Sequence, residues 1–208
     1  MNGPAVLTGT HVRLEPLARL HIAPLVAAAG PDASAYPWSA VPIGMAAMTD
    51  YVNTAIAWRE AGSALPFAIV RIADGVVLGS SRLFLIERWL WPEEHARARQ
   101  AGADGAEIGY TWLGPQAMRT AANTEAKLLM LQFAFEEWHL QRVCFHTDVR
   151  NQRSRNALAR IGARFEGVLR AHRLATDLSA RDSARFSILA AEWPGVKEHL
   201  RQRLAAHG

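Results

Sequence analysis

The stretch Glu107-Ile-Gly-Tyr-Thr-Trp-Leu-Gly-Pro-Gln-Ala-Met-Arg-Thr-Ala-Ala-Asn-Thr-Glu-Ala-Lys127 decides the expected fold, because it passes from a strand through a loop into a helix. Residues 107–113 are predicted to form a strand, and Gly114-Pro115 marks the loop that ends it. The segment 122–138 has helical spacing and is apolar on more than one side, which is typical of a helix buried against a sheet.

The segments that follow extend this pattern. Residues 142–149 are predicted to form another strand and 154–161 another helix, which ends at Gly162. A strand, a helix and a strand in this order favour a right-handed crossover, so the strands at 107–113 and 142–149 are expected to be a parallel pair within a mixed sheet. Asp74-Gly75 predicts the tight turn of an antiparallel hairpin. The other expected elements are strands at 12–17, 66–72, 76–86 and 185–190 and helices at 17–29, 47–61 and 194–204.

Composition places the chain among ordinary globular proteins. It has 208 residues, of which 50% are apolar and 20% charged, with a formal net charge of +4 and a pI near 9.8. Residues 1–208 contain no repeat and no Ser/Pro linker, and they are expected to form a single domain. The small basic excess suits an anionic ligand, but it does not predict nucleic-acid binding from charge alone.

Targeting and redox signals point to one compartment. No apolar run reaches the roughly 18 residues that a membrane span needs, and residues 1–15 lack the apolar core of a signal peptide. Cys144 is the only cysteine, which excludes an internal disulfide, and no Cys-x-x-Cys pair or His-Glu-x-x-His helix suggests zinc. We therefore expect a protein of the reducing cytoplasm, without a membrane anchor and without a metal.

Three segments together resemble a known family: the stretch 107–127, Thr147-Asp-Val-Arg-Asn-Gln-Arg-Ser-Arg-Asn156 and Arg160-Ile-Gly-Ala-Arg-Phe-Glu-Gly-Val-Leu-Arg170. In this order they resemble the GNAT superfamily of N-acetyltransferases, most closely its RimJ/RimL-like branch, from about Val12 to Trp193. The resemblance implies an α/β (α+β) fold with a mixed, mostly antiparallel sheet of about seven strands, a parallel pair at the fourth and fifth strands, and helices on both faces. It also implies transfer of an acetyl group from acetyl-coenzyme A (acetyl-CoA) to a primary amine by direct attack in a ternary complex.

The helix start at Met118–Thr124 is the expected site for the pyrophosphate of coenzyme A, because unpaired N–H groups there lie at the positive end of the helix dipole. The family loop usually reads Gln/Arg-x-x-Gly-x-Gly/Ala, and here Met118, Ala121 and Asn123 fill its slots, so both glycines are missing. A plain, capped helix start is the alternative. Asn151 resembles the family asparagine that faces the pantetheine arm. The residues expected to contact the cofactor are Trp112, Leu113, Met118, Arg119, Thr120, Ala121, Ala122, Asn123, Thr124, Asn151, Ser154 and Asn156.

Glu107 is the expected general base, because an amine must lose a proton before or during attack and the superfamily often places its base at the start of this strand. A surface charge is the alternative. A backbone N–H in a bulged part of the strand, near Trp112 or Leu113, is expected to stabilise the oxyanion. Many family members use a tyrosine as general acid for the thiolate, but the matching position is Leu158, which leaves Ser154, water or unassisted departure of the thiolate.

The acceptor amine is expected to contact Trp38, Glu107 and His146. His146 shares its strand phase with Cys144, and a purely structural histidine is the alternative.

Residues 87–106 are longer than the turn expected between these strands, and we interpret them as an insertion. A short helix is predicted from Pro92 to near Gly102. Trp89 and Trp91 in this segment are compatible with a lid, a homodimer contact or ordinary packing.

Three other functions remain open. The acceptor can be a protein N-terminus, as for ribosomal-type acetyltransferases, in place of a small amine; acidic groove residues would favour a cationic small amine and an open groove a peptide. A non-catalytic CoA-binding or regulatory module would account for the missing glycines and tyrosine. Nucleic-acid binding through the arginines between Arg150 and Arg173 would give an affinity with a steep salt dependence.

Overall fold

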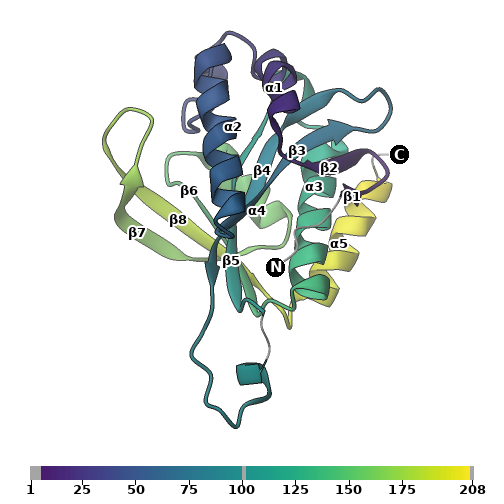
Figure 1. Cartoon of the computed structure of the whole chain (residues 1–208), viewed down its shortest axis with the longest axis vertical. Coiled ribbons are helices and arrows are strands. Elements are labelled where there is room, and N and C mark those ends of the chain that lie inside the picture. The colour runs from purple at the N-terminus through teal and green to yellow at the C-terminus, as the bar shows by residue number, and fades with distance from the viewer. Residues whose placement is uncertain (1–5, 100–101, 207–208) are drawn as a thin grey trace.

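The computed structural model describes residues 6–99 and 102–206, and in them one eight-stranded sheet forms the centre of the molecule (Figure 1). The strands lie in the order β1-β2-β3-β4-β5-β6-β8-β7, and β5 and β6 are the parallel pair in an otherwise antiparallel sheet. The strands are β1 (Leu7–Thr8), β2 (Val12–Pro16), β3 (Ala64–Arg71), β4 (Val77–Glu87), β5 (Gly105–Leu113), β6 (Arg142–Asp148), β7 (Arg164–Leu174) and β8 (Ala180–Leu189).

Helices cover both faces of the sheet, as expected. On one face, Val52 of α2 shares an apolar cluster with Val70 of β3. On the other, Met130 of α3 and Leu200 of α5 share a larger cluster with Phe145 of β6, and α3 and α5 lie side by side (Figure 1). The helices are α1 (Ile22–Ala29), α2 (Met45–Glu60), α3 (Ala121–Gln132), α4 (Gln152–Arg160) and α5 (Trp193–Ala205). Within the described residues, each helix is too short or too polar to cross a membrane.

The fold class, the parallel pair and the hairpin at Asp74-Gly75 are confirmed, whereas some strand segments were not predicted. The sheet has eight strands instead of about seven, because a two-residue β1 pairs with β2. The sequence pattern also missed β7 and the first part of β8. β7 lacks the alternation of apolar and polar residues that predicts a strand, because it is an edge strand with mostly exposed side chains. Its pairing with β8 is also interrupted at Phe165/Gly167 and Leu169/Arg173.

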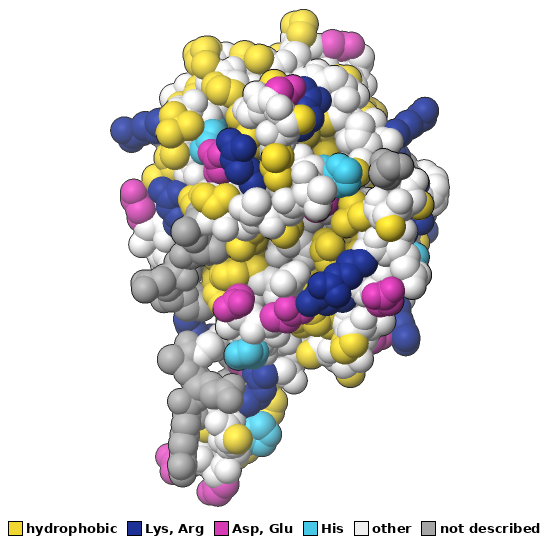
Figure 2. Space-filling view, turned by 90° about the vertical axis from the view of Figure 1, so that its right-hand side faces the viewer, with side chains coloured by type: hydrophobic (Ala, Val, Ile, Leu, Met, Phe, Trp, Pro, Cys, Tyr) yellow, Lys and Arg dark blue, Asp and Glu magenta, His cyan; other side chains and the backbone are white. Residues whose placement is uncertain are grey.

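The segment between β4 and β5 projects from the body of the protein, as Figures 1 and 2 show. The predicted helix from Pro92 is wrong, since the described part has a turn followed by a short 3-10 helix at Ala96–Arg99. Asp104 organises the base of the projection by accepting hydrogen bonds from Trp89 N (2.8 Å) and Trp91 Nε1 (2.9 Å). Packing inside the projection thus uses Trp91, while Leu90 is fully exposed.

A carboxylate of α3 fixes the N-terminal strands to the rest of the fold. Glu125 is buried and accepts hydrogen bonds from the backbone N–H groups of Thr10 (2.8 Å), His11 (2.6 Å) and Val12 (2.6 Å). Thr10 and His11 lie in the turn between β1 and β2 and Val12 begins β2, so one side chain of α3 accepts from three consecutive N–H groups at this connection.

Lys127 of α3 is buried between the helix and the sheet. Its ammonium group contacts Thr111 Oγ1 (2.5 Å) and Ser81 Oγ (3.3 Å). Burial lowers the pKa of Lys127 to about 7, because the low-dielectric interior disfavours the charged form.

Replacing Lys127 by Met is expected to stabilise the fold below pH 7. A lysine in the unfolded chain keeps a pKa of about 10.4. Between about pH 7 and 10 the folded wild type therefore binds fewer protons than the unfolded chain, and its free energy of unfolding rises with pH across that window. Methionine has a similar length and leaves Ser81 and Thr111 hydrogen-bonded to each other (2.7 Å). Urea unfolding at about pH 6 should give a free energy of unfolding about 1 to 3 kcal/mol higher for Lys127→Met. A variant less stable than the wild type at both about pH 6 and about pH 9 would contradict the burial cost.

Candidate active site

β5 and β6 pair over only three residues and then separate. The parallel register joins Gly105 to Arg142, Ala106 to Val143 and Glu107 to Cys144. β5 continues to Leu113 and β6 to Asp148, without further pairing between these two described strands. Main-chain N–H and C=O groups on their facing edges therefore have no strand partner, and an extended ligand with amide groups can satisfy them.

The predicted bulge is present in β5. The pairing with β4 skips residues between Arg82/Gly109 and Ser80/Trp112, and Tyr110 has a positive φ of 51°. Gly79 permits the close approach of the strands, since a Cβ there would lie 2.0 Å from the carbonyl oxygen of Trp112. The bulge changes the direction of the main-chain groups of β5, but the assignment of Trp112 or Leu113 as the oxyanion donor stays a prediction.

The loop before α3 forms an anion-friendly helix start. Thr120 is the N-cap, and its hydroxyl accepts a hydrogen bond from Ala122 N (3.3 Å). The N–H groups of Ala121 and Asn123 have no partner within the helix and point out at its positive end. The two positions that lack the family glycines lie inside helical backbone, whereas the positive φ of 63° falls on Arg119. The missing glycines thus leave the backbone of the helix start intact.

A cavity of about 370 Å³ opens beside this first turn of α3. It is lined by Thr10, His11, Val12, Arg71, Ala73, Leu78, Ala117, Thr120, Ala121 and Ala122. The helix start therefore borders open space and is accessible to a ligand.

The start of α4 lies close to the start of α3. Arg153 Nη1 lies 3.2 Å from Met118 Sδ, which joins the two helix starts. Asn151 is the N-cap of α4, and its side chain accepts a hydrogen bond from Ser154 N (3.0 Å). Asn156 lies on the same helix and accepts from Gln152 Nε2 (2.7 Å). Two helix dipoles thus present their positive ends to one region, which suits a pyrophosphate.

Glu107 is buried at the centre of a polar cluster, the Glu107 cluster, which comprises Glu107 and the half-buried His146, His172, Arg173 and Arg181. Glu107 is 3% exposed, and Arg173 donates to both of its oxygens (2.6 and 3.2 Å). His146 Nδ1 lies 2.9 Å from Glu107 Oε2, outside the angle of a regular hydrogen bond, and the His172 ring lies 4.8 Å from the His146 ring. Burial raises the pKa of Glu107, but His146 and Arg173 outweigh it, and the pKa is lower than usual.

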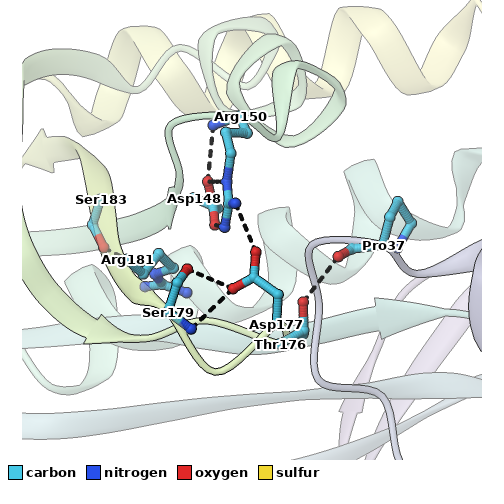
Figure 3. A network of polar contacts seen from close by, with 8 residues as sticks. All are labelled: Pro37, Asp148, Arg150, Thr176, Asp177, Ser179, Arg181 and Ser183. Carbon is cyan, nitrogen blue, oxygen red and sulfur yellow. Dashed lines mark hydrogen bonds and ion pairs between the residues drawn. The ribbon is translucent and has the colours of Figure 1, made fainter.

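A second polar network closes the end of β6 (Figure 3). Arg150 donates to Asp148 (2.7 and 3.0 Å) and to Asp177 (2.8 Å), and its guanidinium lies 4.2 Å from the Trp38 ring centre. Thr176 Oγ1 donates to the carbonyl oxygen of Pro37 (2.9 Å). Hydrogen bonds from Ser179 and Arg150 lower the pKa of Asp177 to about 2. The turn between β7 and β8 is thereby joined to β6 and to the segment between α1 and α2.

The structure brings the expected residues together in two groups. Met118, Arg119 and Thr120 lie at the helix start near Asn151, and Glu107 meets His146. Trp38 packs on Arg150, and Leu158 is buried in the apolar core, so the position matching the family tyrosine faces the interior. Ser154 is half-buried on α4.

Sequence reasoning missed the residues of β7 and β8 in the Glu107 cluster. Arg173 and His172 lie on β7, which was not predicted, and Arg181 lies in the missed part of β8. The turn residues Asp177 and Ser179 between them were the available signal for a hairpin.

Comparison with known proteins identifies the family. The family described as acetyltransferase (GNAT) domain matches residues 11–164. The chain belongs to the GNAT acetyltransferase family. The resemblance found in the sequence is confirmed, and acetyl-CoA is the acyl donor that this family uses.

Several relatives of this GNAT protein share its fold or sequence. A GCN5-related N-acetyltransferase from Brucella melitensis is 30% identical with a TM-score of 0.81, over 96% of this chain and 85% of that one. An acetyltransferase structure from T. thermophilus is 34% identical with a TM-score of 0.78, over 98% and 99%. YdaF of Bacillus subtilis (strain 168), named as a ribosomal N-acetyltransferase, is 36% identical over 92 residues, which are 44% of this chain and about half (49%) of that relative. Its name agrees with the RimJ/RimL-like branch.

Replacing Arg119 by Gly is expected to stabilise the protein and weaken CoA binding. Glycine adopts the left-handed φ of this position without a Cβ penalty, so the free energy of unfolding should rise by about 1 kcal/mol. Loss of the guanidinium removes a cation from the expected phosphate site. Arg119→Lys is the matched control, since it keeps both the charge and the Cβ. Thermal unfolding and calorimetric titration with coenzyme A measure the two effects, and an unchanged affinity in the Gly variant would remove Arg119 from the site.

Proposed function

We propose that the protein is an acetyl-CoA-dependent N-acetyltransferase that modifies the α-amine of a protein N-terminus. The observation that carries the proposal is the separation of β5 and β6 beyond Glu107, beside the starts of α3 and α4. Unpaired strand edges, two helix N-termini and a buried carboxylate meet there, and they fit the pantetheine, the pyrophosphate and the acceptor respectively.

The helix starts would hold the cofactor through the N–H groups of Ala121 and Asn123, with Arg119 and Arg153 as cations nearby. The amide of Asn151 and the free edge of β5 would contact the pantetheine arm. Acetyl-CoA, when bound, supplies a thioester whose acyl carbon accepts the amine. The bulge at Tyr110 would direct a main-chain N–H, at Trp112 or Leu113, toward the oxygen that gains negative charge.

Glu107 would take up the proton that the amine loses, directly or through water. Its low pKa keeps it ionised at neutral pH, and Arg173 holds it in one orientation. Ser154 lies on α4, which begins shortly after β6 ends, and is the side chain proposed to donate a hydrogen bond to the departing thiolate, which then takes its proton from water, since Leu158 offers no acidic hydrogen.

The charges around Glu107 favour an α-amine over a strongly basic amine. Glu107, Asp148 and Asp177 are each engaged by an arginine, so none is available to bind a cation. An α-amine has a pKa of about 8, against about 10.4 for a lysine side chain, and is much more easily deprotonated at neutral pH. The name of YdaF supports a ribosomal protein as acceptor, and a cytoplasmic location and a homodimer are further parts of the proposal.

Calorimetric titration with acetyl-CoA tests the cofactor site. We expect saturable binding on the order of micromolar for the wild type and a loss of about tenfold or more for the double variant Arg119→Glu, Asn151→Ala. Arg88→Glu, an equal charge change in the exposed projection, is the control and should bind normally. Binding by the wild type without turnover of any N-terminal peptide would favour the non-catalytic module, and no binding would overturn the proposal.

Replacing Glu107 by Gln tests the proton acceptor. We expect kcat to fall by about 100-fold or more with little change in acetyl-CoA affinity. Because Glu107 is ionised well below neutral pH, the acidic limb of kcat/KM should report the acceptor amine and keep its position in the variant. Glu166→Gln, another arginine-paired glutamate, is the control. Full activity of Glu107→Gln would show that Glu107 is not the base.

A further inference from the structure

Among the described residues, buried nitrogen atoms without a hydrogen-bond partner are concentrated on the face of the sheet that carries Glu107. They include Nη2 of Arg181, Nε2 of His146, Nδ1 of His172, and Nε and Nη2 of Arg82. Buried polar groups in folded proteins are nearly always satisfied, so such a concentration indicates a place where a ligand or ordered water completes the hydrogen bonding.

Arg82 adds a buried positive charge to this face. It is 1% exposed, and its guanidinium lies 4.0 Å from the ring centre of Tyr110 and 4.7 Å from that of Tyr51. Tyr110 itself is exposed and carries the bulge of β5. Aromatic rings offset only part of the cost of burying a cation, so Arg82 contributes positive potential to the same side of the sheet.

Arg173 and Arg181 stand directly opposite each other in the pairing of β7 with β8. Like charges in directly opposed positions destabilise a sheet, and of the two it is Arg173 that is neutralised, by Glu107. Arg181 uses its Nε to donate to Ser183 Oγ (3.1 Å), and its Nη2 has no partner among the described residues. Burial is the main influence on the pKa of Arg181 and lowers it.

The carboxylate that attracts Arg181 most strongly, that of Asp148, already has a hydrogen-bond partner. Asp148 interacts with Arg181 through space, but both of its oxygens accept hydrogen bonds from Arg150 (Figure 3). The guanidinium of Arg181 beside Glu107 therefore matches an anion that comes from outside the chain.

We propose that Arg181, assisted by His172, binds a carboxylate that the acceptor carries close to its reactive amine. The inference rests on the proposed N-acetyltransferase function and narrows its acceptor to α-amines with a neighbouring carboxylate. Such a group occurs as the side chain of an acidic first residue of a protein, or as the α-carboxylate of a free amino acid. Arginine donates two parallel hydrogen bonds to a carboxylate, so Arg181 also sets the orientation of the amine toward Glu107.

Paired acceptors test the inference, because they differ in charge and hardly in shape. Peptides that begin with Asp or Glu are compared with peptides that begin with Asn or Gln, and free aspartate is compared with its diamide. We expect the wild type to prefer the acidic member of a pair by about 10- to 100-fold in kcat/KM. Preference among peptides identifies a protein N-terminus as the source of the carboxylate, and preference only among free amino acids identifies a small acceptor.

Arg181→Met should abolish the preference for the carboxylate while the calorimetric affinity for acetyl-CoA stays unchanged. Arg170→Met removes an exposed arginine of β7 and is the matched control, which should keep the preference. Equilibrium titration with the acidic and amide peptides gives a second readout that needs no turnover. If Arg181→Met does not fold, Arg181→Lys serves, since an ammonium cannot form the paired hydrogen bonds.

Equal use of acidic and amide acceptors by the wild type would overturn the carboxylate site, and so would an equal loss for both acceptors in Arg181→Met. These results differ from a failure of the proposed function, in which the wild type binds no acetyl-CoA or turns over neither member of any pair.

Discussion

The structure depends on a parallel strand pair that is interrupted almost as soon as it begins. β5 and β6 share three paired residues, from Gly105 to Glu107 on one strand, and then diverge within a continuous sheet. Unpaired main-chain groups in a sheet carry a free-energy cost, so the separation has to be imposed by other contacts. The bulge at Tyr110 turns β5, and the antiparallel pairing with β8 holds β6 along its whole length. The exposed edges that result are the feature a ligand can use.

Ion pairs connect the strands on each side of this gap to the β7–β8 hairpin. Arg173 on β7 reaches Glu107 on β5, so an ion pair spans the strands between them. At the far end of β6, Arg150 connects Asp148 to Asp177 of the β7–β8 turn. Buried and half-buried pairs with several hydrogen bonds are directional, and they can fix the spacing of two strands without closing it. The charged groups that hold these strands in place thus include the groups of the candidate site.

Most of the fold and half of the site could be predicted from the sequence, and the division has a physical cause. The helix start at 118–124 and the strand with Glu107 follow from local periodicity and caps. Arg173 lies 66 residues from Glu107, on an exposed edge strand with irregular pairing, and no local pattern reports such a contact. Arg181 lies in the first part of β8, which pairs with this edge strand and was missed with it. The helix start forms without the family glycines, because the left-handed residue is Arg119 and α3 begins after it.

The arginines affect both partners in the proton transfer. Together with His146, Arg173 lowers the pKa of Glu107, which makes this carboxylate a weaker base. Proton transfer depends, however, on the difference between the pKa values of donor and acceptor. A positive potential from Arg82 and Arg181 lowers the pKa of an approaching amine as well as that of the carboxylate. The difference between the two is then largely preserved, while the fraction of neutral, nucleophilic amine at pH 7 increases. A carboxylate on the acceptor would offset the repulsion between these arginines and any remaining ammonium. An α-amine with a neighbouring carboxylate is therefore the acceptor best matched to this face.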